Sequence, residues 1–253
     1  MRKISFSIIF FIITMFLFCD AKGEDIAKKY FNLKKSNDCF SITTMVLIDK
    51  NGNKKTRKIE SYSKESKDGR NSFMKFIEPA DVKGTTFLIM GYRDGDDDQR
   101  LYLPALGKVR KISSSNKGQK FMGSDLTFYD MEDHEYNDFT FKYLKDENYD
   151  GKDCYVIEMY PKDKYAPYSK QTAWICKNDN FAYKLECYDK KNINNKIKTI
   201  VSLDVKNYSG VLMPQRVAVD NHLENHKTLL QDTNIKVNTG LKDNIFTIQN
   251  MER

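Results

Sequence analysis

The stretch that decides the fold of this chain is Phe76–Met131, FIEPADVKGTTFLIMGYRDGDDDQRLYLPALGKVRKISSSNKGQKFMGSDLTFYDM. An apolar segment, Thr85–Met90, follows a turn at Pro79–Gly84. A second segment, Arg100–Leu103, follows the acidic turn Asp94–Asp98, and a basic, serine-rich loop completes the stretch. Short apolar runs bounded by turn residues are typical of strands. We interpret the stretch as strand, turn, strand and a covering loop, and nothing in it has the pattern of an active site.

The same alternation of apolar and polar residues extends outward through most of the chain. One face of each segment is apolar and the other polar, which is typical of antiparallel sheet. The turn Asn51-Gly52-Asn53 separates the first two segments, because Asn and Gly accept positive φ readily. About ten strands are predicted, which is more than a flat open sheet carries without curling. The segments outside the opening stretch are Cys39–Ile48, Lys55–Ser63, Ser72–Ile77, Cys154–Tyr160, Gln171–Cys176, Phe181–Tyr188, Ile197–Val205, Arg216–Val219 and Leu229–Val237.

Few helices are available to cover such a sheet. Glu24–Asn37 is predicted to be helical, because Ile26, Tyr30 and Leu33 recur at helical spacing. Asp125–Met131 is a second, shorter candidate, and Asn244–Phe246 is expected to dock a last turn. Two short helices cannot fill the concave side of a large sheet. Either the sheet closes on itself, or an apolar cavity remains.

Three runs in the central stretch, GTTFL, QRLYLPALGKVRKI and FMGSDLTFYDM, carry a resemblance to a known family. The chain resembles the bacterial outer-membrane lipoprotein-sorting proteins, which are LolA-like and LolB-like periplasmic carriers. The resemblance implies a mainly β fold of α+β type: a curved antiparallel sheet that forms a half-barrel, its concave side closed by a few short helices. It also implies binding without catalysis and without a cofactor. The expected partners are a lipid or lipidated protein as cargo and an inner-membrane transporter.

Composition agrees with one globular domain. The chain has 253 residues, of which 40% are hydrophobic, 30% charged and 13% aromatic, and its net charge is +7. Aromatic residues suit a pleated surface. Charges of both signs are scattered along the chain, so we interpret most of them as solvated strand faces. No repeat or linker divides the chain, and we expect a single domain at 24–253.

The N-terminus predicts export. Met1-Arg2-Lys3 is followed by the apolar run Ile4–Phe18 and by small residues in Ala21-Lys22-Gly23. This pattern is typical of a secretory signal peptide, here 1–23, and it predicts a periplasmic protein. The run is short for a membrane anchor, which needs about 20 residues. Cys19 offers a lipid-anchored alternative, although Phe18 stands where lipoprotein signals have a small residue.

The other cysteines are Cys39, Cys154, Cys176 and Cys187. An exported chain can form disulfides, and four cysteines allow three pairings. If Cys154–Tyr160 and Gln171–Cys176 form a hairpin, Cys154 and Cys176 lie nearly opposite, which favours that pair. The alternative is that all four are small buried hydrophobic residues.

The apolar faces of the strands are predicted to line a lipid-binding cavity. Residues two apart in a strand share a face. We therefore expect one concave site below Phe121 and Phe128, with Ser113–Gly118 and Gly123–Met131 as candidate lids. Trp174, in mid-strand, belongs either to the core or to the cavity. The remaining lining residues are predicted to be Phe87, Ile89, Leu101, Leu103, Tyr155, Ile157, Met159, Phe181, Tyr183 and Leu185.

A basic group lies beside the candidate lid, formed by Lys108, Arg110, Lys111, Lys117 and Lys120. The simpler interpretation is that these basic side chains are solvated surface residues. The alternative is contact with anionic headgroups or a membrane surface, which attracts such clusters at about 1 kcal/mol per cation. Export and the absence of a base-reading motif disfavour nucleic acid.

Metal and catalytic patterns are weak. His222 and His226 stand in HLENH, which is not a zinc-protease motif, and two ligands without a third make a poor site. Asp94–Asp98 resembles a calcium loop but lacks its glycine and its closing glutamate. Ser113-Ser114-Ser115 lacks the glycines of a nucleophile elbow. No metal site and no enzyme activity are predicted.

The sequence therefore favours non-enzymatic binding and transfer of a lipid or lipidated protein toward the outer membrane, with peripheral membrane contact. The alternative is an envelope structural or adhesive protein that has the same sheet and a filled core. Cavity volume separates the two, because a carrier needs hundreds of Å³ and a structural protein is packed throughout.

Overall fold

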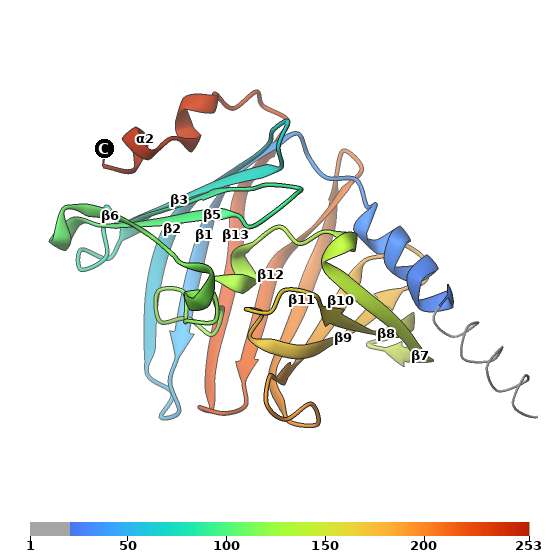
Figure 1. The fold of residues 1–253 in the computed structure, drawn as a ribbon. Helices are drawn as coiled ribbons and strands as arrows, with labels where there is room; N and C mark the ends of the chain where they lie inside the picture. The colour runs from blue at the N-terminus through green and yellow to red at the C-terminus, as the bar shows by residue number, and fades with distance from the viewer. Residues whose placement is uncertain (1–20, 253) are drawn as a thin grey trace, which may run out of the picture.

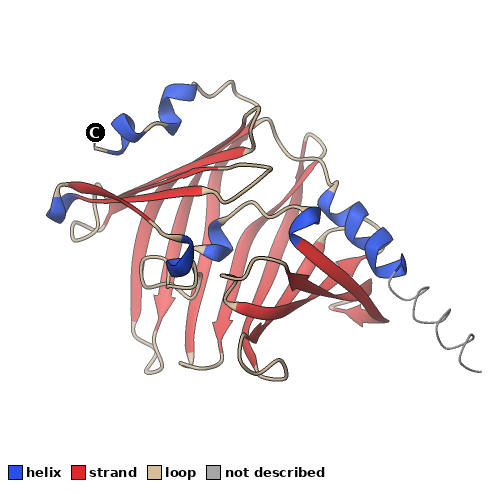
Figure 2. Ribbon diagram, viewed as in Figure 1, coloured by secondary structure: helices blue, strands red, loops and turns tan. Residues whose placement is uncertain are grey.

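The computed structural model describes residues 21–252, and most of the predicted signal peptide, residues 1–20, lies outside this range. Within the described residues, one sheet of 13 antiparallel strands curves around a concave side without closing into a barrel (Figure 1). The expected fold, a curved antiparallel half-barrel with few helices, is confirmed. Figure 2 shows how little helix accompanies the sheet.

The strands follow the predicted segments closely and add two that the sequence analysis missed, β6 and β7. β6 has only four residues, and β7 has too few apolar residues in its second half to be recognised. The strands are β1 (Asp38–Ile48), β2 (Lys54–Glu65), β3 (Arg70–Glu78), β4 (Thr86–Met90), β5 (Asp98–Leu103), β6 (Lys108–Lys111), β7 (Phe139–Tyr149), β8 (Lys152–Pro161), β9 (Tyr168–Cys176), β10 (Ala182–Asp189), β11 (Lys196–Tyr208), β12 (Val211–Asn221) and β13 (His226–Val237).

The strand order explains how the concave side is covered. It runs β6-β5-β4-β3-β2-β1-β13-β12-β11-β10-β9-β8-β7. The chain starts at the centre of the sheet, moves outward to β6, and restarts at β7 on the opposite edge. Residues 112–138, which we call the crossing loop, must therefore span the concave side. The loop contains short 3-10 turns, η2 (Ser114–Asn116), η3 (Tyr129–Met131) and η4 (Tyr136–Asp138).

The N-terminal helix is shorter than predicted at its C-terminal end. Helix is described over residues 21–31, and residues 32–37, which we call the strap, are irregular and lead into β1. The strap sequence NLKKSN has one apolar residue, so it offers no stripe to bury. In the predicted second helix, Asp125–Met131, only the turn η3 is helical.

Two covers pack on the concave side. The N-terminal helix buries Ile26 and Ala27 against Phe139, Ile157 and other residues of β7–β10. The crossing loop buries Phe121 and Phe128 against β1–β5. On the opposite face, the C-terminal segment covers Leu88 with η5 (Asp243–Phe246) and α2 (Ile248–Met251), and the predicted last turn is confirmed. β4 is therefore buried on both faces, which explains its continuous apolar run TFLIM.

Candidate functional site

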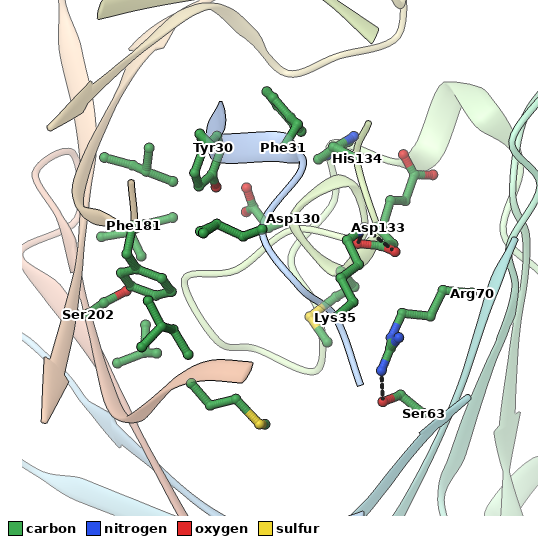
Figure 3. A pocket seen from close by; sticks show the side chains of 18 of the residues that line it. Tyr30, Phe31, Lys35, Ser63, Arg70, Asp130, Asp133, His134, Phe181 and Ser202 are labelled. Carbon is green, nitrogen blue, oxygen red and sulfur yellow. Dashed lines mark hydrogen bonds and ion pairs between the residues drawn. The ribbon is translucent and has the colours of Figure 1, made fainter. Parts of the chain in front are cut away.

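A cleft of about 680 Å³ lies on the concave side between the two covers. Its floor comes from β8–β13, and its rim from the end of the N-terminal helix, the strap and residues 126–134 of the crossing loop (Figure 3). The apolar lining residues of the floor are Met159, Phe181, Leu185, Ile200, Val211, Leu212, Met213, Val217 and Leu230. This volume falls within the range of small-molecule and lipid sites.

The cleft contains three of the predicted cavity residues, Met159, Phe181 and Leu185. Ile157 lies next to them but is fully buried below the N-terminal helix, and Tyr155 packs at the margin of the same cluster. These five side chains share the concave face, but the helix fills the space above Ile157.

A second group of predicted residues forms a filled core instead of a cavity wall. Phe87 and Ile89 are buried, and Leu101 is half-buried, against Phe121 and Phe128. The rings of Phe87 and Phe121 have centroids 4.9 Å apart, and those of Phe87 and Phe128 are 5.6 Å apart. Leu103 is half-buried and lies outside the cleft lining. The crossing loop thus fills the half of the concave side that faces β1–β5.

Trp174 and Tyr183 lie on the opposite face of the sheet, with Cys154 and Cys176. Tyr183 and Leu185 were predicted to share a face. A break in register between Ala182 and Lys184 separates them, because a β-bulge inserts a residue and reverses the alternation.

The predicted disulfide is absent from the structure. Cys154 pairs in register with Cys176, as the hairpin predicts. All four cysteines among residues 21–252 are nevertheless free and buried thiols, as in the alternative interpretation. The Cys154 Sγ lies 3.5 Å from the Lys152 carbonyl oxygen, to which it donates, so it points along its own strand. Burial raises the pKa of the Cys154 thiol to about 11.

The structure divides the predicted basic group. Lys108, Arg110 and Lys111 are exposed on the edge strand β6. Lys117 is buried within the crossing loop, where its ammonium contacts three carboxylates. Lys120 forms an ion pair with Glu224 in the turn after β12. Lys117 is therefore withdrawn from any anionic surface, whereas the other four remain exposed, Lys111 with Asp98 as a partner.

Sequence reasoning missed the polar side of the cleft. Arg70 of β3 donates to the carbonyl oxygen of Ser36 and to the hydroxyls of Ser36 and Ser63 (Figure 3). Lys35 of the strap pairs with Asp133 of the crossing loop, at 2.9 Å to each carboxylate oxygen. Neither pair has a local sequence signal, because the partners come from distant segments.

Buried carboxylates fasten the crossing loop to the sheet. The Asp125 side chain is fully buried and accepts hydrogen bonds from the Thr228 hydroxyl at 2.8 Å and the Asn221 amide at 3.0 Å. His226 Nδ1 lies 2.6 Å from the same carboxylate. Asp130 contacts the Lys198 ammonium at 2.6 Å and accepts from the Tyr168 hydroxyl at 2.9 Å.

Lys117 and Glu132 form a third buried contact, at 3.0 Å, and Gln99 of β5 donates to the same glutamate at 2.7 Å. Burial raises the pKa of Glu132 to about 7, although the ammonium and the amide partly oppose this rise. The neighbouring Asp97 also has its pKa raised by burial, to about 6. These groups hold the crossing loop against β5.

The candidate metal ligands have other partners. His222 lies 2.8 Å from the Thr199 hydroxyl, and His226 contacts Asp125. Asp98 pairs with Arg100, and Asp96 with Lys117. Over residues 21–252 no group of three or more His, Cys, Asp or Glu is arranged to hold a metal ion.

A curved open sheet with a partly covered apolar cleft defines the LolA-like class of folds. A family model described as "Uncharacterized protein" matches residues 68–253. An outer membrane lipoprotein-sorting protein domain from Vibrio parahaemolyticus is 34% identical, with a TM-score of 0.88 over 92% of this chain and 100% of that one. A DUF1329 family protein from Desulfovibrio piger is 31% identical, with a TM-score of 0.87 over 92% and 99%.

The chain belongs to this outer membrane lipoprotein-sorting protein family, as its central motif indicated. A LolA superfamily protein from Nitrosomonas europaea shares the fold at 22% identity, with a TM-score of 0.71 over 90% of this chain and 98% of that one. No curated protein matches the chain. Among the described residues, no helix is both long enough and apolar enough to span a membrane.

Proposed function

We propose that this protein is a non-enzymatic carrier that binds the acyl chains of a lipid or a lipidated protein in the cleft and transfers them toward the outer membrane. The single observation that carries the proposal is the apolar cleft of about 680 Å³ on the concave side. The relative from Vibrio parahaemolyticus, described as a lipoprotein-sorting protein domain, supports the same role. Each buried CH₂ of an acyl chain stabilises the complex by about 0.8 kcal/mol.

The site supports binding and not chemistry. Its floor is mainly aliphatic and aromatic, with Gln171 and Ser202 as polar lining residues, and the rim lysine Lys35 is paired with Asp133. In this proposal the protein works in the periplasm, after removal of its signal peptide or tethered through Cys19. An inner-membrane transporter is the proposed donor, and Lys108, Arg110 and Lys111 on β6 are proposed to contact anionic headgroups.

The test places a carboxylate on the cleft floor. Val217 of β12 lines the cleft, whereas Ala218 lies next to it on the opposite face. We expect Val217→Asp to lower the affinity for an apolar fluorescent probe at least tenfold, about 1.4 kcal/mol, because the charge must be desolvated. Ala218→Asp is the matched control and should bind as the wild type does. Fluorescence titration and a thermal melt are measured for each protein.

Failure of the wild-type protein to take up the probe would contradict the proposed carrier function. That result would leave the envelope structural role, in which the crossing loop and the N-terminal helix simply complete a core. Equal losses of affinity in both variants would place the binding surface outside the cleft.

A further inference from the structure

We infer that the strap is the moving cover of the cleft, and that the crossing loop is a fixed part of the sheet's core. This inference rests on the proposed function and concerns the regulation of the same site. It reverses the expectation from sequence, which placed the lids at Ser113–Gly118 and Gly123–Met131.

The crossing loop cannot leave the sheet without exposing unpaired charges. Asp125 has no exposed side-chain surface, and Asp130 has 5%. Their partners Thr228, Lys198 and Tyr168 lie on three different strands. Lifting the loop would leave Lys198, itself 6% exposed, without its carboxylate in an apolar interior. Removing one partner of a buried ion pair is strongly unfavourable.

Burial of aromatic rings holds the same loop. Phe121 and Phe128 are buried against Phe87 and lie edge to face, with ring centroids 5.8 Å apart. Moving the loop would expose these rings together with the carboxylates. The loop therefore opens only with the surrounding core.

The strap is held differently. Its middle has two polar contacts to the rest of the protein, Lys35 with Asp133 and Lys34 with the carbonyl oxygen of Ser209 at 2.8 Å. Both lysine contacts are solvent-exposed, and the side chains of Lys35 and Asp133 are 41% and 35% exposed. Water can replace such contacts at little cost.

The strap lies between two packed parts of the fold. At one end the N-terminal helix buries Ile26 and Ala27 in the core, and the ring of Phe31 stacks on that of Phe139 with centroids 5.9 Å apart. At its other end, Ser36 is buried and accepts from Arg70, and the Asn37 N–H donates to Asn238 at 2.8 Å. Both ends of the strap are therefore fixed. Outward movement of Leu33–Lys35 between them would widen the cleft between β1 and the N-terminal helix.

The labelling rates of two native cysteines measure how readily each cover opens, and this measurement needs no bound ligand. Cys39 lines the cleft next to the C-terminal end of the strap and belongs to β1, which is paired on both sides, so fraying of a sheet edge does not expose it. Cys187 is fully buried below the crossing loop, against Tyr129 and Tyr168. We expect a thiol reagent to label Cys39 at least tenfold faster than Cys187 under native conditions, as measured by peptide mass spectrometry. Labelling of Cys187 at the same rate or faster would overturn the inference.

Cross-linking then tests whether movement of the strap is what exposes Cys39. The double variant Lys35→Cys/Asp133→Cys, joined by a short bismaleimide, ties the strap to the crossing loop. Lys120→Cys/Glu224→Cys is the matched control, because it replaces another exposed ion pair and ties the crossing loop to the turn after β12. The first cross-link should slow both labelling of Cys39 and uptake of an apolar fluorescent probe at least tenfold. The second should change each rate less than twofold.

The two readouts separate the inference from the function on which it rests. If the wild type does not bind the probe, the proposed function fails, while the labelling rates still decide which cover moves. If the control cross-link slows labelling of Cys39 and the strap cross-link does not, the crossing loop is the gate and the inference is wrong.

Discussion

Two opposing effects act on the side-chain carboxyl group of Glu132. Its side chain is 8% exposed, and burial disfavours its charge, whereas Lys117 and Gln99 favour it. Burial prevails, so that the pKa of Glu132 rises from 4.5 to about 7. The contact also joins the crossing loop to β5 through Gln99. The protonation of one carboxyl is therefore coupled to the stability of the whole cover.

The first prediction concerns pH. Between about pH 4.5 and pH 7 the folded protein binds more protons at Glu132 than the unfolded chain does. This contribution to the free energy of unfolding is thus fully present below about pH 4.5 and is lost as the pH rises through 7. At 1.36 kcal/mol per pKa unit, it is on the order of 3 kcal/mol.

Urea unfolding across this pH range checks the prediction. The wild type minus Glu132→Gln difference in unfolding free energy should decrease as the pH rises. Glu224→Gln, which removes an exposed carboxylate from an ion pair, serves as the control for loss of a surface charge. A difference that increases with pH would mean that Lys117 holds Glu132 in its charged form.

At the scale of elements, the two covers differ in the kind of contact that holds them. The crossing loop depends on buried carboxylates and aromatic rings, and the middle of the strap on one exposed ion pair and one exposed hydrogen bond. The connectivity of the sheet accounts for this difference. The loop joins the two edge strands, so it must cross the concave side and bury whatever it carries.

Truncation of one aspartate that holds each cover, Asp125 for the crossing loop and Asp133 as the partner of the strap, measures this difference. Asp125→Ala should lower the free energy of unfolding by roughly 3–5 kcal/mol, because it leaves buried partners unpaired. Asp133→Ala removes the exposed partner of Lys35 and should cost less than about 1 kcal/mol. Urea denaturation of the two variants beside the wild type gives both values. Similar losses would mean that the strap contributes to the fold as much as the crossing loop.

The whole molecule is an open sheet whose edges are covered unequally. The edge strand β6 has the sequence KVRK, and its charges discourage pairing with another chain. At the other edge the N-terminal helix approaches β7 closely: a Cβ on Gly23 would lie 2.8 Å from the Tyr143 nitrogen. Lys22 also stacks on Tyr143, with its ammonium 3.6 Å from the ring centroid. The predicted cleavage site thus adjoins a packed part of the fold.

Processing is the prediction at this scale. Cleavage after Gly23 should give a mature N-terminus at Glu24, found by N-terminal sequencing of protein from its native host. The contacts of Lys22 would then be absent from the mature protein, at little cost because the Lys22–Asp146 pair is exposed. An acylated Cys19 in the intact mass would contradict this site and show a lipid-anchored protein that retains Ala21–Gly23.

The sequence by itself determined the strands, the turns and the family. Alternation, together with short apolar runs bounded by turns, located eleven of the strands because each has a local pattern, and the motif between Gly84 and Met131 indicated the class before any contact was known. The site could be predicted only in part, through Met159, Phe181 and Leu185. Alternation tells which residues share a face, but not whether another segment fills the space above that face.

Only the tertiary structure decided where the core ends and the cleft begins. Breaks in register place an extra residue in β13 between Thr233 and Lys236 and another in β10 between Ala182 and Lys184, and neither has a local sequence signal. The charges of the crossing loop are neutralised by distant residues, as Asp130 is by Lys198, 68 positions away. A carboxylate that is solvated in the extended chain becomes buried only when the strands that carry its partners assemble. Which cover is fixed, and which can move, is therefore a property of the assembled sheet.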